Sequence, residues 1–491
     1  IRPFVTLAEH KKTSRPAVFR VRSRVSDPID RAVGFKDGTY PNSPQKLYTR
    51  LQFRLHERVR GGVLVEKDSG ERRLDDLRLY HLAFRLSDQA LLFLGDYTLE
   101  VGQGLVLWGP YGFSKSAEAI YPLRKRPRGL RGYLTVDENA DLRGAATRLK
   151  LGMAELLAFV SRKKLDATPS SDDAVSSLFT TGLHRTRTEE NKKDVLAESV
   201  IGGHLSYILP VGLKLGLSYV HSNYDKTISS SDLVRKRYAF RGKTNEVMGV
   251  NWSWEGRQYQ LFGEFARSKS GGTALLAGTI LDFDALRLAF LHRNYQKDFQ
   301  NFRAFGFGER NGATQNEVGY YTGLEYKLSR GTTVRAYYDI FRQPWRTFFS
   351  SLPGQGQELL TQVEQRLGRR VILTVRFRQK TKEETEKVVD ARGRAKEEFS
   401  DETVTRWRVQ ADVHVSRRLA LRGRVELGSH RTHGFGTDGE RSHENGVLLF
   451  SEVKWRPHRR LTVLTRLSFF DTDSFASRLF QYEHDVPGVV T

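Results

Sequence analysis

The segment KLYTRLQFRLH, residues 46–56, decides the fold class because apolar and polar side chains alternate along it. The same alternation recurs in RVILTVRFR, residues 370–378, and in RWRVQADVHV, residues 406–415. In all three segments arginine recurs at the polar positions. A period of two residues is typical of a β-strand with one apolar face and one polar face.

Strands of this kind follow one another from about residue 15 to the end, with no extended linker between them. A long chain built this way predicts an all-β fold, a large antiparallel transmembrane β-barrel of about 20–26 strands with lipid outside and water inside. We therefore expect residues 1–491 to form a single outer-membrane barrel. Neither residues 1–12 nor the turn-like DVPGVVT at 485–491 resembles a barrel strand, so we expect the barrel to be incomplete at both ends.

The connections between these strands alternate in length, as they do in outer-membrane barrels. Short polar turns are expected at 85–89, 152–154, 210–212, 255–257, 329–331, 416–418 and 456–459. Long polar loops are expected at 161–194, 223–243, 293–315, 380–401 and 430–444. A soluble sandwich or propeller has no reason to alternate its loop lengths so regularly.

Charge is the strongest compositional signal. The 491 residues include 80 Lys and Arg against 57 Asp and Glu, which gives a net charge of +23. Such a chain favours polyanionic partners, although a solvated basic surface is the simpler explanation. The absence of cysteine excludes disulfides and thiolate metal sites. Mean hydropathy is −0.51, and no apolar run is long enough for a membrane helix, whereas a membrane strand needs only about 9–11 residues.

A glycine-dense segment, residues 98–140, breaks the strand pattern. An insertion this long either folds into the barrel interior as a plug or constriction, or caps the outer mouth. Its charged residues could bind a polyanion or could form a solvated, salt-bridged loop. The candidates are Arg124, Lys125, Arg126, Arg128, Arg131, Asp137 and Glu138.

The same region carries a family resemblance. It contains GDY (95–97), GQGL (102–105), WG (108–109), RKRPRGLR (124–131), DEN (137–139) and RGAA (143–146). This series resembles outer-membrane proteins of Bacteroidota and related phyla that carry a helix-hairpin-helix region before a large β-barrel. The resemblance implies a periplasmic helical module that contacts DNA, and that module is absent from this chain.

Arginines on the polar strand faces are the main functional candidates, because a ring of guanidinium groups inside a barrel favours anions. They are Arg20, Arg22, Arg24, Arg50, Arg54, Arg376, Arg378, Arg406, Arg408, Arg422, Arg424 and Arg466. The alternative is a structural ladder in which these arginines pair with acids such as Glu57, Asp412 and Glu426 to fill a wide barrel.

No nucleophile elbow, zinc-protease motif or phosphate-binding loop occurs, so we expect no enzyme activity, cofactor or metal. The chain is predicted to be a channel or translocation barrel with a cationic lumen, located in the bacterial outer membrane and passing an anionic or nucleic-acid substrate. The alternative is a plugged scaffold that anchors a periplasmic module; a soluble polyanion binder fits least. Expected partners are outer-membrane lipid and lipopolysaccharide, DNA or another polyanion, and other envelope proteins.

Overall fold

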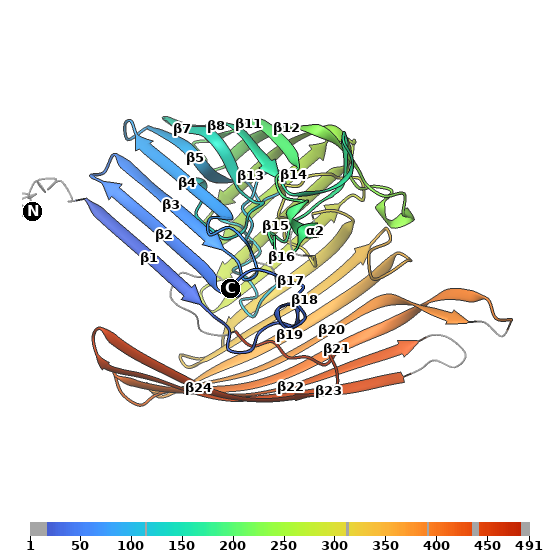
Figure 1. The fold of residues 1–491 in the computed structure, drawn as a ribbon. Helices are drawn as coiled ribbons and strands as arrows, with labels where there is room; N and C mark the ends of the chain where they lie inside the picture. The colour runs from blue at the N-terminus through green and yellow to red at the C-terminus, as the bar shows by residue number, and fades with distance from the viewer. Residues whose placement is uncertain (1–16, 113–114, 311–313, 390–391, 435–440, 483–491) are drawn as a thin grey trace, which may run out of the picture.

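The computed structural model describes residues 17–112, 115–310, 314–389, 392–434 and 441–482. Within these ranges the chain forms one sheet of 24 strands, in which wall strands pair antiparallel with their neighbours along the chain. Figure 1 shows this sheet curving round into a wall. The prediction of an all-β antiparallel barrel fold with about 20–26 strands is confirmed. The expectations for the two chain ends concern residues 1–12 and 485–491, which lie outside the described ranges.

The strand bounds follow the alternating segments closely. The first half of the chain holds β1 (Val18–Ser26), β2 (Lys46–Leu55), β3 (Val59–Lys67), β4 (Leu77–Arg85), β5 (Ala90–Glu100), β6 (Gly129–Gly132), β7 (Leu142–Leu151), β8 (Ala154–Leu165), β9 (Ala167–Ser171), β10 (Ala174–Leu178), β11 (Leu196–Ile208) and β12 (Lys214–Ser229). The second half holds β13 (Arg241–Glu255), β14 (Tyr259–Ser268), β15 (Thr273–Phe283), β16 (Leu286–Tyr295), β17 (Glu317–Lys327), β18 (Thr332–Gln343), β19 (Gly354–Leu367), β20 (Val371–Val389), β21 (Ala395–His414), β22 (Leu419–Gly434), β23 (Arg441–His458) and β24 (Leu461–Thr472). The short helices are α1 (Val33–Lys36), α2 (Arg187–Glu190) and the 3-10 turn η2 (Val234–Lys236).

Short and long connections alternate around much of the wall as expected, although β14 and β15 are joined only by residues 269–272, where a long connection would fall. The short turns at 86–89, 152–153 and 256–258 each join two consecutive wall strands. Strand β6 lies in the connection between β5 and β7, while β9 and β10 form a small hairpin between β8 and β11. Because consecutive strands are antiparallel, the long connections lie at one end of the wall and most of the short turns at the other.

Two segments expected as loops, 380–401 and 430–444, are largely strand. Strands β20 and β21 continue their ladder as far as Val389 and Ala395, and Figure 1 shows this hairpin projecting beyond the wall. The expectation was wrong because the hairpin tip carries charged side chains on both faces and therefore lacks the apolar alternation. Cross-strand pairs stabilise it instead: the Nζ of Lys382 lies 2.5 Å from Oε2 of its register partner Glu402.

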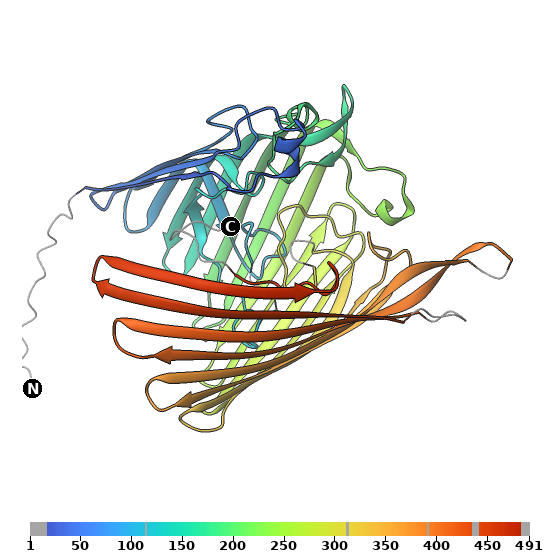
Figure 2. The same cartoon turned by 60° about the horizontal axis from the view of Figure 1, so that its bottom comes forward.

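The two faces of the wall differ as the alternation requires. Large apolar side chains are exposed on the outer face; for example, Val21 is 70% exposed, Trp407 51% and Leu467 60%. The arginines of the same strands lie on the inner face. Among the described residues, β1 pairs only with β2 and β24 only with β23. Figure 2 shows the C-terminal strands, coloured orange to red, crossing in front of the rest of the wall. No helix in the described part of the chain is long and apolar enough to cross a membrane.

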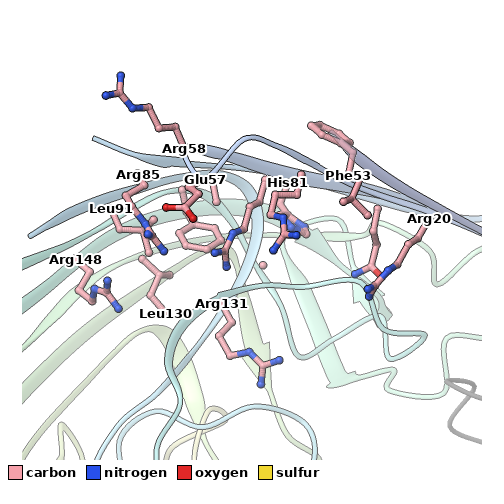
Figure 3. A pocket seen from close by; sticks show the side chains of 18 residues that line it. Arg20, Phe53, Glu57, Arg58, His81, Arg85, Leu91, Leu130, Arg131 and Arg148 are labelled. Atoms are coloured by element: carbon pink, nitrogen blue, oxygen red, sulfur yellow. The ribbon is translucent and has the colours of Figure 1, made fainter. Parts of the chain in front are cut away.

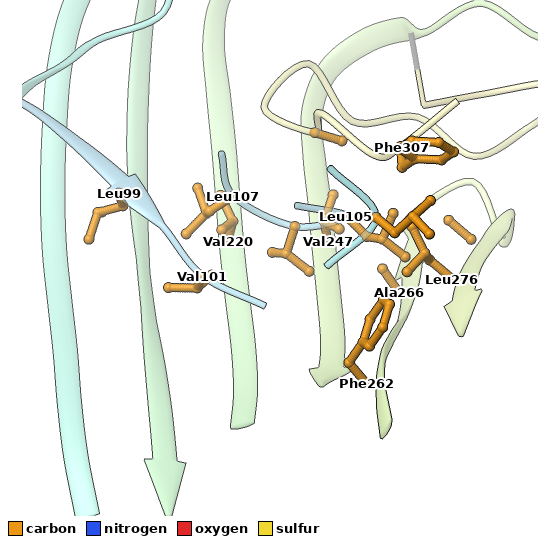
Figure 4. Packing of buried hydrophobic residues seen from close by; sticks show 14 of the residues in the cluster. Leu99, Val101, Leu105, Leu107, Val220, Val247, Phe262, Ala266, Leu276 and Phe307 are labelled. Carbon is orange, nitrogen blue, oxygen red and sulfur yellow. The ribbon is translucent and has the colours of Figure 1, made fainter. Parts of the chain in front are cut away.

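The insertion between β5 and β7 packs against the inner face of the wall. Its residues Leu105 and Leu107 are buried in one cluster with Val247 of β13 and Leu276 of β15 (Figure 4). The cluster extends from β4 as far as Leu360 of β19. Residues 98–100 of the predicted insertion belong to β5, and Gly129–Gly132 forms β6. Of the residues between these two strands, the described ones, 101–112 and 115–128, have no strand structure. We call residues 101–128 the insert.

Two buried charged contacts fix the insert to the wall. Glu264 of β14 is fully buried, and its Oε2 accepts hydrogen bonds from the backbone N–H groups of Gln103 at 2.5 Å and Leu105 at 3.0 Å. Lys115 lies among three carboxylates, with Nζ 3.0 Å from Asp339 and 2.8 Å from Glu358. Its third partner is Glu309, at 2.5 Å. These charges are paired across the insert–wall boundary, so the insert is a fixed part of the folded interior.

Candidate functional site: an arginine pocket on the inner wall

The predicted inward arginines form two groups on different parts of the wall. The N-terminal group lies on β1 and β2 and comprises Arg20, Arg22, Arg24, Arg50 and Arg54. The C-terminal group lies on β20 to β22 and β24 and comprises Arg376, Arg378, Arg406, Arg408, Arg422, Arg424 and Arg466. Both groups occupy the polar face opposite exposed apolar residues, so sequence alone gives them the same description. Their surroundings differ.

The C-terminal arginines are held by acceptors on neighbouring strands. Arg378 Nε donates to Glu358 at 2.7 Å, and Arg408 Nε donates to Glu426 at 2.7 Å. The remaining acceptors are Gln362 for Arg376, the Arg478 carbonyl for Arg406, Asp412 for Arg422, Gln410 for Arg424, and Glu452 with the Tyr482 carbonyl for Arg466. Four of the seven, Arg378, Arg408, Arg422 and Arg466, therefore pair with carboxylates as in a structural ladder, whereas the other three bond neutral acceptors.

The N-terminal wall instead contains a cavity of about 560 Å³ lined by seven arginines. They are Arg20, Arg54, Arg58, Arg60, Arg85, Arg131 and Arg148. Glu57 is the one acidic residue among the described residues that line it. We call this site the arginine pocket. Figure 3 shows Arg85, Arg131 and Arg148 approaching from different segments, whereas Arg58 projects away from the others.

The strand register builds this cluster. Arg54 of β2 lies directly opposite Arg60 of β3, and Arg148 of β7 lies opposite Leu91 of β5, next to the turn that follows Arg85. Directly opposed like charges destabilise a sheet unless something lies between them. Among the described residues, none of the seven arginine side chains has a hydrogen bond or ion pair. The pocket therefore concentrates positive charge that the described chain leaves unneutralised.

The remaining arginines of the N-terminal wall lie beside the pocket. Arg22 of β1 is the register partner of Arg50 of β2, which repeats the opposed-arginine arrangement. One terminal nitrogen of Arg22, Nη1, is buried without a hydrogen-bond partner among the described residues. Arg24 lies opposite Tyr48. Basic character thus continues along β1 and β2 away from the pocket.

Of the insertion's candidate residues, only Arg131 lines the arginine pocket. Arg124 pairs with Glu255 and Gln260, and Arg128 pairs with Glu100. Lys125 is buried, bonds the Phe305 carbonyl and lies 4.3 Å from the Trp108 ring centre, while Arg126 stacks on Tyr121. Asp137 accepts from the Asn139 backbone, and Glu138 lies beside Gly182. Most of these charges are therefore satisfied within the folded protein.

Sequence reasoning missed five of the basic residues that line the pocket: Arg58, Arg60, Arg85, Arg148 and His81. Arg60 precedes a Gly-Gly pair, and Arg85 and Arg148 lie close to strand ends, so none of them interrupts a clear apolar alternation. The available signal was their position in the alternation. Each of the four residues that lie in strands is an even number of positions along its strand from a side chain that packs on the inner face. Only the strand register shows that they meet.

A second cluster lies among the long connections, around His184. Its Nδ1 lies 2.6 Å from Asp76 and its Nε2 lies 2.9 Å from Asp166, while its backbone N–H donates to Glu71. The ligand atoms of Glu71, Asp76 and His184 lie within 4.8 Å of one another, which would admit a cation. However, both ring nitrogens of His184 form hydrogen bonds to carboxylates. Since an ionised carboxylate only accepts hydrogen bonds, each nitrogen must carry a hydrogen, and the imidazole is therefore protonated. His184 thus joins the β3–β4 and β8–β11 connections.

Protonation of His184 gives this junction a pH dependence. Burial alone would lower the pKa of His184, but its hydrogen bonds to Asp166 and Asp76 outweigh burial and raise the pKa to about 10. The folded pKa exceeds the ordinary value of 6.5, so the stabilisation is complete below pH 6.5 and is lost as pH rises through about 10.

We expect His184→Gln to lower the local opening free energy by about 3 kcal/mol, because it leaves buried carboxylates unpaired. Hydrogen exchange at residues 68–76 and 184–194 should then accelerate roughly a hundredfold at pH 7. In the wild type the opening free energy should fall progressively above pH 6.5, and the same acceleration should be reached as pH approaches about 10. His414→Gln, at an exposed position, is the matched control. Equal exchange in wild type and variant at pH 7 would contradict the role of His184.

Comparison with known proteins gives structural likeness only. No protein-family model and no curated protein sequence matches the chain. Among solved structures it is similar to OccAB3 of Acinetobacter baumannii, with 12% identity, 93% of this chain and 98% of that chain covered, and a TM-score of 0.32. A mutant of the ferric enterobactin receptor PfeA of Pseudomonas aeruginosa has 10% identity over 91% of this chain and 74% of that one, with a TM-score of 0.45. A BenF-like porin from Pseudomonas fluorescens has 12% identity over 93% of this chain and 97% of that one, with a TM-score of 0.31.

Proposed function

We propose that this chain is the barrel of a bacterial outer-membrane channel that passes anions along its N-terminal inner wall. Three features support a membrane location: the apolar outer face, the strand alternation, and the separation of short turns from long connections at opposite ends. An outer face with many exposed large apolar residues would be costly in water, whereas lipid would cover it.

The arginine pocket is the single observation on which the proposal of an anionic substrate rests. Seven arginines meet one glutamate at a cavity on the inner face, without ion-pair partners among the described residues. The cost of opposing Arg54 and Arg60 is offset when an anion lies between them. The pocket adjoins the turns at 56–58 and 86–89, which belong to the short-turn end, the periplasmic end in barrels of this type.

The insert favours a second candidate, a plugged scaffold that does not transport. Its apolar side chains lie in the buried cluster that extends from β4 to β19, and contacts of Glu264 and Lys115 hold it against the wall. A barrel filled in this way would conduct little and would serve to anchor other envelope components. Under the channel proposal, the insert narrows the pathway but leaves the arginine pocket accessible.

Nucleic acid is the polyanionic version of the proposed substrate. The net charge of +23 and the resemblance to helix-hairpin-helix barrels support it, and the strand arginines would contact the phosphate backbone. Short single-stranded DNA is therefore the appropriate second solute in a transport assay.

The test is the current of the full chain in a planar bilayer under a tenfold KCl gradient, before and after adding short single-stranded DNA. We expect a reversal potential of the sign for chloride selectivity, because an arginine-lined path concentrates anions. Reduction of this current by DNA would support the polyanionic version. A cation-selective current would refute the anion channel, and a silent bilayer with confirmed insertion would favour the scaffold.

A further inference from the structure

The arginine pocket has two chemically distinct parts. Its rim carries guanidinium groups, whereas its floor contains apolar side chains from β4, β5 and the start of β6. Ala83, Phe93 and Leu130 of this floor are each at least nine-tenths buried in the folded chain. Leu91 lies between them and Arg148, its register partner on β7. A ligand that uses the whole cavity therefore needs both negative charge and an apolar body.

Polar atoms at the boundary of the two parts lack partners. Nε of Arg148 and Nδ1 of His81 are buried and have no hydrogen-bond partner among the described residues. A buried donor without an acceptor costs about 1–3 kcal/mol, so an unfilled pocket is a strained arrangement. An anionic oxygen beside Leu91 could accept from Arg148 without disturbing any ion pair that the described chain makes.

The spacing of the arginines distinguishes between kinds of anion. A carboxylate presents two oxygens, which match the fork of one guanidinium. A phosphate monoester carries nearly two negative charges and three acceptor oxygens, so it can satisfy guanidinium groups from more than one strand. Arg54 and Arg60 face each other across β2 and β3, and Arg131 approaches from β6. This convergence matches a dianion better than a monoanion.

We propose that the arginine pocket binds a phosphate monoester whose organic part is flat and apolar, with the phosphate among the arginines and the ring on the floor formed by Leu91, Phe93 and Leu130. The cavity of about 560 Å³ is large enough for such a ligand. This proposal deepens the proposed anion channel by naming the substrate class of its pocket, and it rests on that function for its biological role. Binding itself can be measured without transport.

The experiment is calorimetric titration of the detergent-solubilised full chain with phenyl phosphate, inorganic phosphate, benzoate and phenol. We expect saturable binding of phenyl phosphate at least tenfold tighter than that of inorganic phosphate or benzoate, and none of phenol. Arg60→Gln with Arg148→Gln should weaken phenyl phosphate at least tenfold. Leu91→Ala should weaken phenyl phosphate but leave inorganic phosphate unchanged, because it alters only the floor. Arg330→Gln, at an exposed turn outside the pocket, is the control and should bind like the wild type.

Equal affinity for phenyl phosphate and benzoate would overturn the assignment of a dianion. Unchanged affinity in the double arginine variant would overturn the location. Failure of this proposal is distinguishable from failure of the channel. The expected order of affinities in a protein that is silent in bilayers would support the pocket and refute transport. An anion-selective current without saturable binding would overturn the pocket and leave the channel.

Discussion

Replacing the insert, residues 101–128, with a four-residue Gly-Ser turn should raise the single-channel conductance about tenfold or more, because it removes the packed interior of a wide barrel. The splice is geometrically simple, since Glu100 of β5 and Gly129 of β6 are register partners. The β5–β6 hairpin therefore keeps its ladder, and Arg131 stays at the pocket. The measurement is single-channel current in symmetric salt.

The wall should tolerate this deletion. Glu264, which binds insert backbone, would become solvated in the water-filled interior rather than left in an apolar space. Likewise Asp339 and Glu358 would lose Lys115, but Asp339 keeps Arg293 at 2.7 Å and Glu358 keeps Arg378 at 2.7 Å. Heat-modifiable migration of the variant on a gel is the check that the barrel still folds.

Lys115→Gln offers a version of the same test without a deletion. It leaves Glu309, Asp339 and Glu358 with one fewer cation at the insert–wall boundary. Uncompensated buried charge of this kind costs about 3–5 kcal/mol, so the insert should loosen and the current should flicker between small and large levels. If the deletion variant folds and inserts yet conducts like the wild type, the insert does not limit the pathway.

The strand architecture was predictable because alternation is a local property. Segments such as residues 46–56 and 406–415 show their two faces within about ten residues, and the structure makes them β2 and the second half of β21. The projecting hairpin of β20 and β21 was not predictable in this way. Cross-strand pairs such as Lys382 with Glu402 stabilise it, and such pairing depends on register rather than on apolar pattern.

For the functional candidates, the sequence predicted which face each arginine occupies but not whether it has a partner there. Arg54 and Arg408 look alike in sequence, since each alternates with apolar residues. Arg408 faces Arg376 on β20 but also meets Glu426 on β22, whereas Arg54 has Val18 on β1 and Arg60 on β3 as its two register partners. Whether an inward arginine is neutralised or exposed to a ligand is decided by its cross-strand neighbour. The cluster around His184 was not predicted from the sequence either, because its partners come from separate connections.

Charge reversal at Arg60 and Arg148 together should change the sign of the reversal potential from anion-selective to cation-selective. Both arginines line the pocket without a hydrogen bond or ion pair among the described residues, so no intramolecular partner is lost when they become glutamate. The added carboxylates would instead pair with Arg54 and Arg85 and reduce the local positive potential. We expect the anion-to-cation permeability ratio to fall by about tenfold or more.

The C-terminal part of the wall, where the arginines have hydrogen-bond acceptors, supplies the contrasting variant. Arg408→Glu removes the partner of Glu426 and places two carboxylates together, so it should lower folded yield by weakening the wall more than it alters selectivity. Arg330→Glu, at an exposed turn, should change neither. If Arg408→Glu shifts the reversal potential as much as the pocket variant does, selectivity follows total charge and the arginine pocket has no special role. If only the pocket variant shifts it, the ions pass along the N-terminal wall, where the facing arginines Arg54 and Arg60 have no acceptor among the described residues.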